Sequence, residues 1–192
     1  MPNAKDDKAA KDDSESAAES RSSFGFVAVL VALAVVAFVL MRSSRPTDVE
    51  FNSVLLPPLE VHGWLNAAAP IRNEDLRGKV VLVDCWFVDC PPCRAAMPHL
   101  VEFNNRFRSS GVKVIGLTPD SGGDVPRAEA FVKSIPGMDW PIGYGASIPL
   151  DVLGVHEYPT LILFDKQGRS VWAGHGFSGL DEAVIQALAA QP

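Results

Sequence analysis

Two cysteines separated by two residues are the part of this sequence best suited to chemistry. The motif reads Cys90-Pro91-Pro92-Cys93. Two thiols at this spacing can form a disulfide with each other. When they do so at the expense of a disulfide in another protein, two electrons pass between the two proteins. We expect Cys90 to be the exposed thiol that attacks first. We expect Cys93 to be less accessible and to resolve the mixed disulfide.

The residues on either side of the motif predict a turn from a strand into a helix. Residues 80–87 form an apolar run, which predicts a buried strand, and residues 94–108 predict an amphipathic helix. Cys90 would then lie at the N-terminus of that helix, where the positive end of the helix dipole favours a thiolate. A Cys-x-x-Cys motif in this position is typical of a redox-active site.

Charges and prolines near Cys90 predict the direction of the exchange. Arg94 favours the thiolate, whereas Asp89 disfavours it by like charge. Both intervening prolines lack a backbone N–H, so the sulfur keeps few donors besides the Cys93 amide. A less stabilised thiolate means a less stabilised reduced form. We therefore expect the pair to act as a reductant.

Asp84 stands in the predicted buried strand, six residues before Cys90. A buried carboxylate is costly unless it has a task or a partner. Desolvation raises the pKa of such a group, so we expect Asp84 to take the proton of Cys93 as that thiol attacks. The alternative is a hydrogen-bonded structural role. We interpret the adjacent Cys85 as a small buried apolar residue, with a resolving or metal-binding thiol as the alternative.

Composition limits the remaining possibilities. With 192 residues, of which 47% are hydrophobic, the chain can form one domain of ordinary size plus appendages. The net charge of −6 comes without a basic stripe, which argues against a nucleic-acid partner. Three cysteines are too few for a disulfide scaffold. No second Cys-x-x-Cys or His pair completes a zinc site, so we expect no metal and no cofactor beyond the Cys90–Cys93 disulfide.

The N-terminal third predicts a membrane attachment. Residues 1–23 are polar and charged and predict a disordered tail. Residues 24–41 form an uncharged apolar run that would span roughly 27 Å as a helix, just enough to cross a bilayer. No small-x-small cleavage pattern follows, so we expect an uncleaved signal anchor rather than a cleaved signal peptide or a buried core helix. Residues 42–58 predict a tether, and residues 59–192 predict the globular domain.

Basic residues around the apolar run predict its orientation. Four Lys or Arg residues precede the run and two follow it closely. This excess favours a cytoplasmic N-terminus, which would place the globular domain outside the cytoplasm, at the inner membrane.

The rest of the chain predicts an α/β fold. Apolar runs after the motif predict three further strands, at residues 112–117, 160–164 and 170–173. Apolar spacing predicts helices over residues 124–135 and 178–188. Residues 138–155 carry mixed signals for a short strand and a turn of helix. This order of elements predicts a central mixed sheet with helices on both faces.

Residues 59–190 resemble the thioredoxin superfamily, and more closely its membrane-anchored TlpA/ResA-like thiol-disulfide oxidoreductases. The resemblance rests on Val83-Asp84-Cys85-Trp86 before the motif, Arg94 and Pro98 after it, and Tyr158-Pro159-Thr160. It implies a thioredoxin-like fold with Pro159 in a cis-proline loop beside the sulfurs. It also implies a set of substrate-contacting residues: Trp86, Pro91, Pro92, Tyr158 and Pro159.

The resemblance also implies partners. They are a disulfide-containing exported protein such as apocytochrome c and a membrane electron donor of the DsbD/CcdA type. Three residues depart from the family pattern. Ala96 stands where many relatives have Glu, Asp89 where an aromatic residue is common, and Tyr158 is bulkier than usual. The rival interpretation is a membrane-tethered binding module with a structural disulfide.

Overall fold

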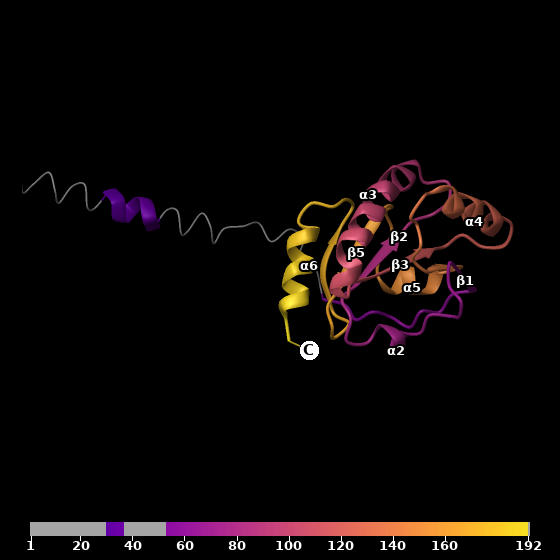
Figure 1. Ribbon diagram of the computed structural model, residues 1–192, viewed down its shortest axis with the longest axis horizontal. Helices are drawn as coiled ribbons and strands as arrows, with labels where there is room; N and C mark the ends of the chain where they lie inside the picture. The colour runs from indigo at the N-terminus through magenta and orange to yellow at the C-terminus, as the bar shows by residue number, and fades with distance from the viewer. Residues whose placement is uncertain (1–29, 37–52, 192) are drawn as a thin grey trace, which may run out of the picture. The chain divides into compact units, whose positions relative to one another are not determined.

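The structure is a computed structural model that describes residues 30–36 and 53–191 (Figure 1). Residues 30–36 are helical, and they belong to a unit separate from the globular one. No helix within the described ranges has both the length and the apolar character that a membrane crossing needs. The predicted tail 1–23 lies outside the described residues, as do most of the predicted anchor 24–41 and tether 42–58.

A six-stranded mixed sheet forms the centre of the globular unit (Figure 1). Its order is β1 (Gly63–Leu65), β4 (Ile142–Tyr144), β3 (Lys113–Thr118), β2 (Val81–Cys85), β5 (Thr160–Phe164) and β6 (Ser170–Gly174). β2, β3 and β4 are parallel neighbours, and the other three pairings are antiparallel. The predicted mixed sheet is confirmed.

Helices cover both faces of this sheet, as the sequence predicted. On one face, buried residues of α3 (Pro91–Phe107), α4 (Val125–Ser134) and α6 (Leu180–Ala189) form a single core with the sheet, which we call the α3-side core. On the other face, α2 (Asn73–Leu76) and α5 (Ser147–Val152) contribute to a second core, which we call the α5-side core.

Strand β2 lies in the middle of the sheet and carries its side chains alternately into the two cores. Leu82 and Trp86 belong to the α3-side core, whereas Val83 and Cys85 belong to the α5-side core. The alternation therefore places Asp84 on the α3 side, the side that also holds the two cysteines of the motif.

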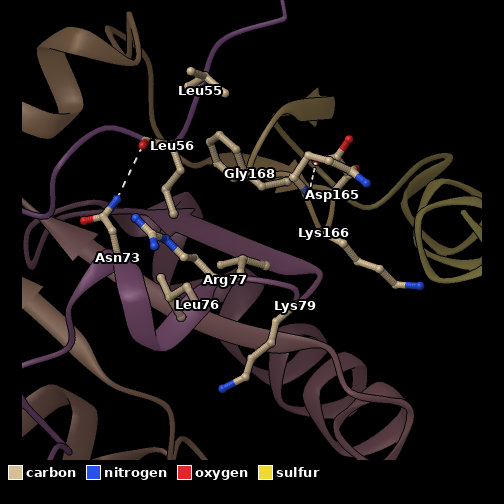
Figure 2. A pocket seen from close by; sticks show the side chains of 12 residues that line it. Leu55, Leu56, Asn73, Leu76, Arg77, Lys79, Asp165, Lys166 and Gly168 are labelled. Carbon is tan, nitrogen blue, oxygen red and sulfur yellow. Dashed lines mark hydrogen bonds between the residues drawn. The ribbon is translucent and has the colours of Figure 1, made fainter. Parts of the chain in front are cut away.

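Residues 53–58, which the sequence predicted to be part of the tether, contact the β5–β6 turn. The Leu56 N–H donates to the Gly168 carbonyl, and Leu55 pairs with Arg169 in an antiparallel bridge. A pocket of about 230 Å³ lies where this segment meets α2 and the β5–β6 turn. Figure 2 shows the side chains that line it. Its Lys79 and Lys166 ammonium groups already donate to backbone carbonyls. Val81 lines the pocket at the start of β2, whereas the motif follows the other end of that strand.

Candidate active site

Cys90 and Cys93 form a disulfide at the N-terminus of α3, with 5.3 Å between their Cα atoms. Cys90 is the N-cap residue of this helix, and the two prolines are its first residues. Prolines fit there because the first N–H groups of a helix have no partner within the helix. The Cys93 N–H donates to Cys90 Sγ over 3.2 Å. The predicted disulfide and its place at a helix N-terminus are confirmed.

The sulfurs are less accessible than the sequence predicted. Cys90 is 2% exposed and Cys93 is 0% exposed, so the expectation of an exposed Cys90 is wrong for this oxidised state. Both residues belong to the α3-side core, against which the half-buried Phe87 and Tyr158 pack. These two rings meet edge to face, with 5.2 Å between their centroids. Cys90 Sγ, which we expected to be open to solvent, is therefore buried among apolar and aromatic neighbours.

The predicted substrate-contacting residues divide into surface and core positions. Pro91 and Pro92 are exposed, and Tyr158 and Pro159 are half-buried and joined by a cis peptide bond. Trp86 is 0% exposed, and its ring packs against Phe131 with 5.6 Å between centroids. Trp86 therefore does not reach a bound substrate, and the prediction of a contact role for it is wrong. Its side chain follows the β2 alternation into the core.

Asp84 is buried, as predicted, with only 2% of its surface exposed. Its Oδ2 atom has no hydrogen-bond partner, and burial raises the pKa of the carboxyl group to about 7. It lines a narrow pocket together with Ala96, Met97 and Leu100. These three residues follow Cys93 by three, four and seven positions, so they share its face of α3. The carboxyl group thus lies beneath the helix face that carries Cys93.

Cys85 points into the α5-side core and is 0% exposed. Burial raises the pKa of its thiol well above the usual value, and the charge of Asp84 raises it further. The sheet separates this thiol from Cys93, which belongs to the opposite core. Cys85 is accordingly a buried apolar residue and not a resolving thiol. Within residues 30–36 and 53–191, no group of three His, Cys, Asp or Glu residues could hold a metal ion.

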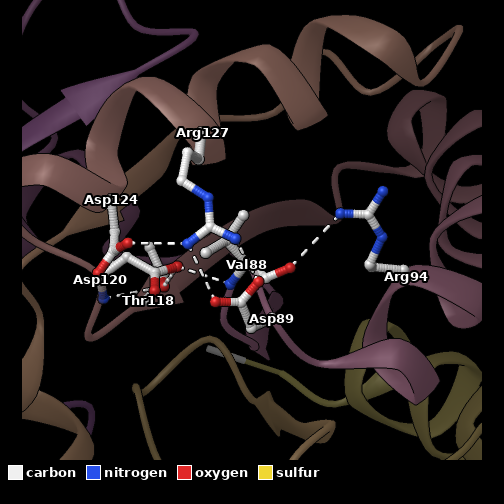
Figure 3. Close-up of polar contacts among 7 residues, drawn as sticks. All are labelled: Val88, Asp89, Arg94, Thr118, Asp120, Asp124 and Arg127. Carbon is white, nitrogen blue, oxygen red and sulfur yellow. Dashed lines mark hydrogen bonds and ion pairs between the residues drawn. The ribbon is translucent and has the colours of Figure 1, made fainter.

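The loop before Cys90 is tied to α4 by an arginine that sequence reasoning missed. The Arg127 guanidinium donates to both carboxylate oxygens of Asp89 and, over 3.0 Å, to Asp124 (Figure 3). The hydrogen bond from Arg127 is the main reason why the pKa of the Asp89 carboxyl group is lowered. Asp89, next to Cys90 in the chain, is therefore half of an ion pair and not the lone carboxylate that we expected.

Two further contacts hold the same loop (Figure 3). The Val88 N–H donates over 2.7 Å to Asp120, which also accepts from the Thr118 hydroxyl over 2.6 Å. Arg94 reaches toward the Val88 carbonyl at 3.5 Å and lies over the Phe131 ring, 4.2 Å from its centroid. The end of β3 and the start of α3 thus fix the backbone that leads into the disulfide.

A disulfide at a helix N-terminus, beside a cis-proline loop and on the same face of the sheet as a buried Asp84, defines a thioredoxin-like domain. A family model described as thioredoxin-like matches residues 78–170. The chain belongs to the thioredoxin-like superfamily.

Its relatives include thiol-disulfide oxidoreductases. Protein DipZ of Mycobacterium bovis is 33% identical over 135 residues, which cover 67% of this chain and 19% of DipZ. The thiol-disulfide oxidoreductase ResA of Bacillus anthracis is 33% identical over 103 residues, covering 53% of this chain and 57% of ResA. A thiol-disulfide isomerase from Corynebacterium glutamicum, known as a crystal structure, is 26% identical with a TM-score of 0.63, covering 73% of this chain and 99% of that one. The chain spans less than two thirds of the length of DipZ and of this ResA.

Proposed function

We propose that this protein is a thiol-disulfide oxidoreductase that reduces disulfides in exported proteins. The observation that carries the proposal is the Cys90–Cys93 disulfide at the N-cap of α3, above the buried Asp84. The similarity to ResA, which bears the name thiol-disulfide oxidoreductase, supports the same reaction class. Exposed Pro91 and Pro92 and the half-buried Tyr158 would form the surface that a substrate chain meets.

The exchange proceeds in two steps. The Cys90 thiolate attacks one sulfur of the substrate disulfide, and the other substrate sulfur leaves as a thiolate that takes a proton from solvent. Asp84 then accepts the proton of Cys93, whose sulfur attacks Cys90 Sγ. The Cys90–Cys93 disulfide forms, the bond from Cys90 to the substrate breaks, and the second substrate sulfur leaves with the electron pair. Two electrons pass from the protein to the substrate.

The surroundings of Cys90 in the structure support a reducing role, but they support it less strongly than the sequence alone suggested. Neither proline can donate to the sulfur, so the Cys93 N–H is the backbone donor beside it. Asp89 adds less than expected because Arg127 pairs with it. We expect a potential nearer to the roughly −270 mV of thioredoxin than to the roughly −120 mV of DsbA. Equilibration with glutathione measures it, and a value above about −180 mV would refute the reducing role.

We also propose that residues 24–41 anchor the protein in the inner membrane as a single span, with a cytoplasmic N-terminus and the thioredoxin-like domain on the outer side. The uncharged apolar run and the excess of basic residues before it support this arrangement. The substrate would be apocytochrome c or another exported protein, and the electron donor would be a DsbD/CcdA-type membrane protein. Fusing alkaline phosphatase after residue 58 tests the orientation, because that enzyme gains activity only outside the cytoplasm.

An insulin-reduction assay tests the reaction itself. The wild type should reduce insulin in the presence of dithiothreitol, and Cys90→Ser should abolish that activity. Activity that survives in Cys90→Ser would refute the assignment of the attacking thiol. If the wild type is inactive, the domain is a binding module with a structural disulfide. In cells, Cys93→Ala should accumulate a mixed disulfide on Cys90, and the trapped protein identifies the partner.

A further inference from the structure

His175 follows strand β6 and lies beside the cis-proline loop, which comprises residues 156–159. The pairing of β6 with β5 extends to Gly174, and His175 comes next, beside Thr160 at the start of β5. On its other side, Phe177 packs against the α3-side core. The backbone that carries His175 is therefore fixed both before and after this residue.

The cis-proline loop forms neither helix nor strand, and two of its carbonyl groups accept hydrogen bonds from side chains. The Thr160 hydroxyl donates to the Glu157 carbonyl over 2.6 Å. His175 Nδ1 lies 3.0 Å from the Pro159 carbonyl oxygen and 3.2 Å from Thr160 Oγ1. A carbonyl oxygen can only accept, and the Thr160 hydroxyl already donates to Glu157. Nδ1 therefore carries the hydrogen that these two oxygens share.

The second ring nitrogen of His175 reaches the other end of the loop. Nε2 lies 3.5 Å from Glu157 Oε2, and a hydrogen on Nε2 turns this contact into an ion pair. One imidazole ring thus contacts the residues on both sides of Tyr158. The His175 and Glu157 side chains are 62% and 79% exposed, and exposed pairs of this kind add little to stability. The contacts therefore restrain a surface loop and contribute little to the stability of the fold.

We propose that His175 is a positioning residue for substrate binding, which holds the cis-proline loop so that Tyr158 and Pro159 meet the substrate chain in one geometry. The inference rests on the proposed function, because this geometry matters only if a protein substrate crosses the loop. A loop that is held before binding loses less conformational freedom when the substrate arrives. Release of the loop should therefore weaken the binding of a protein disulfide, whereas a small disulfide that does not reach the loop depends on it less.

Three variants release the loop to different degrees. His175→Ala removes both contacts of the ring. His175→Asn is the conservative variant, because its amide group can donate to the Pro159 carbonyl from nearly the position of Nδ1. Glu157→Gln removes only the charge of the second contact, and it tests the proposal if His175→Ala does not fold. The matched control is His62→Ala, an exposed histidine before β1, at the edge of the sheet opposite β6. Thermal melting establishes that each variant folds.

The first measurement follows the loop itself. The chain has only two tyrosines, Tyr144 and Tyr158, so 3-fluorotyrosine gives two 19F signals in the full-length protein, and Tyr144→Phe assigns them. His175→Ala should shift or broaden the Tyr158 signal and leave the Tyr144 signal in place. His175→Asn should return the Tyr158 signal toward the wild type. The proposal is overturned if the Tyr158 signal is the same in His175→Ala and in His62→Ala.

The second measurement compares a protein disulfide with a small one. His175→Ala should raise the KM for insulin about fivefold and change kcat by less than about twofold, because it weakens binding and not the exchange itself. His175→Asn should recover most of the lost affinity. The reaction of the reduced protein with Ellman's reagent, a small disulfide, should slow by much less than the reaction with insulin.

The outcomes separate this inference from the proposed function. If the wild type reduces insulin and His175→Ala has the same KM, the positioning role is refuted. Equal losses with insulin and with Ellman's reagent would also refute it, because the defect would then lie at the cysteines. A changed Tyr158 signal in His175→Ala, in a protein that fails to reduce insulin, would refute the proposed function and leave the hold of His175 on the loop intact.

Discussion

Arg127, on α4, pairs with Asp89, the residue that precedes Cys90 (Figure 3). The guanidinium group donates to both oxygens of the Asp89 carboxylate and also holds Asp124. A bidentate pair of this kind fixes the direction of both side chains. The negative charge next to the disulfide is thus balanced by a residue from a different helix, and the loop before Cys90 is tied to that helix.

The first prediction concerns the charge of this pair. Arg127→Gln should raise the pKa of the Cys90 thiol in the reduced protein, because it leaves the Asp89 carboxylate unpaired beside the forming thiolate. The ultraviolet absorbance of the thiolate, followed against pH, measures the effect. Lys133→Gln is the matched control, since Lys133 lies on the same helix and pairs with Glu129. If the rise persists when Asp89→Asn is added, the carboxylate is not its cause.

The second prediction concerns the pH dependence of stability. Burial raises the pKa of Asp84 from 3.8 to about 7, so the folded protein keeps a proton that the unfolded chain releases. The free energy of unfolding should therefore fall as pH rises from about 4 to about 7, and the loss approaches roughly 4 kcal/mol above that range.

Asp84→Asn removes this titration and keeps the shape of the side chain. Urea unfolding of both proteins at several pH values should show the variant gaining on the wild type between about pH 4 and pH 7, and no further above it. Asp165→Asn, at the partly exposed β5–β6 turn, serves as the control. Parallel curves for Asp84→Asn and the wild type across this range would contradict the buried, high-pKa state of Asp84.

The contrast between Asp84 and Arg127 shows what could be predicted from the sequence. Asp84 stands in a continuous apolar run, and that local pattern is enough to predict its burial and its raised pKa. Arg127 and Asp89 are 38 residues apart, and only the packing of α4 beside the loop brings them together. The 3.0 Å contact between His175 Nδ1 and the Pro159 carbonyl oxygen, 16 residues apart, depends in the same way on the pairing of β5 and β6.

The elements of the fold also divide into those that a local sequence pattern predicts and those that it does not. The apolar runs predicted β2, β3 and β5, because each of these strands is buried over most of its length. β6 is mostly half-buried, and the turn at residues 165–169 between two strand-like segments predicted it. β1 and β4 have only three residues each, too few for a period of two to be recognised. The burial of Cys90 could not be predicted from the sequence either, since it comes from the α3-side core, against which Tyr158 packs from 68 residues away.

The third prediction concerns the aromatic pair beside the disulfide. Tyr158→Ala should speed the reduction of the disulfide by dithiothreitol several-fold, because the Tyr158 ring packs against Phe87 and against the core that buries both sulfurs. Stopped-flow tryptophan fluorescence can follow the reaction. Tyr158→Phe keeps the ring and should react at the wild-type rate. Equal rates in Tyr158→Ala and Tyr158→Phe would mean that the ring does not limit access.

The last prediction concerns the close packing of β3 against the strand that leads to the active site. Gly116 is the β3 partner of Asp84, and a Cβ atom there would lie 2.9 Å from Ile142 Cγ1 and 3.2 Å from Trp86 Nε1. Both neighbours are fully buried and cannot move aside freely. Gly116→Ala should therefore destabilise the protein by about 1–3 kcal/mol.

Gly123→Ala provides the control, because a Cβ atom there meets nothing within 4 Å and the backbone is not in the left-handed region. Its stability should stay within about 1 kcal/mol of the wild type. Chemical denaturation followed by tryptophan fluorescence measures both variants. Because Trp86 directly precedes the loop that Arg127 and Asp120 hold, Gly116→Ala should also slow disulfide exchange in the folded protein. Equal stabilities for the two glycine variants would show that β3 has room to yield at Gly116.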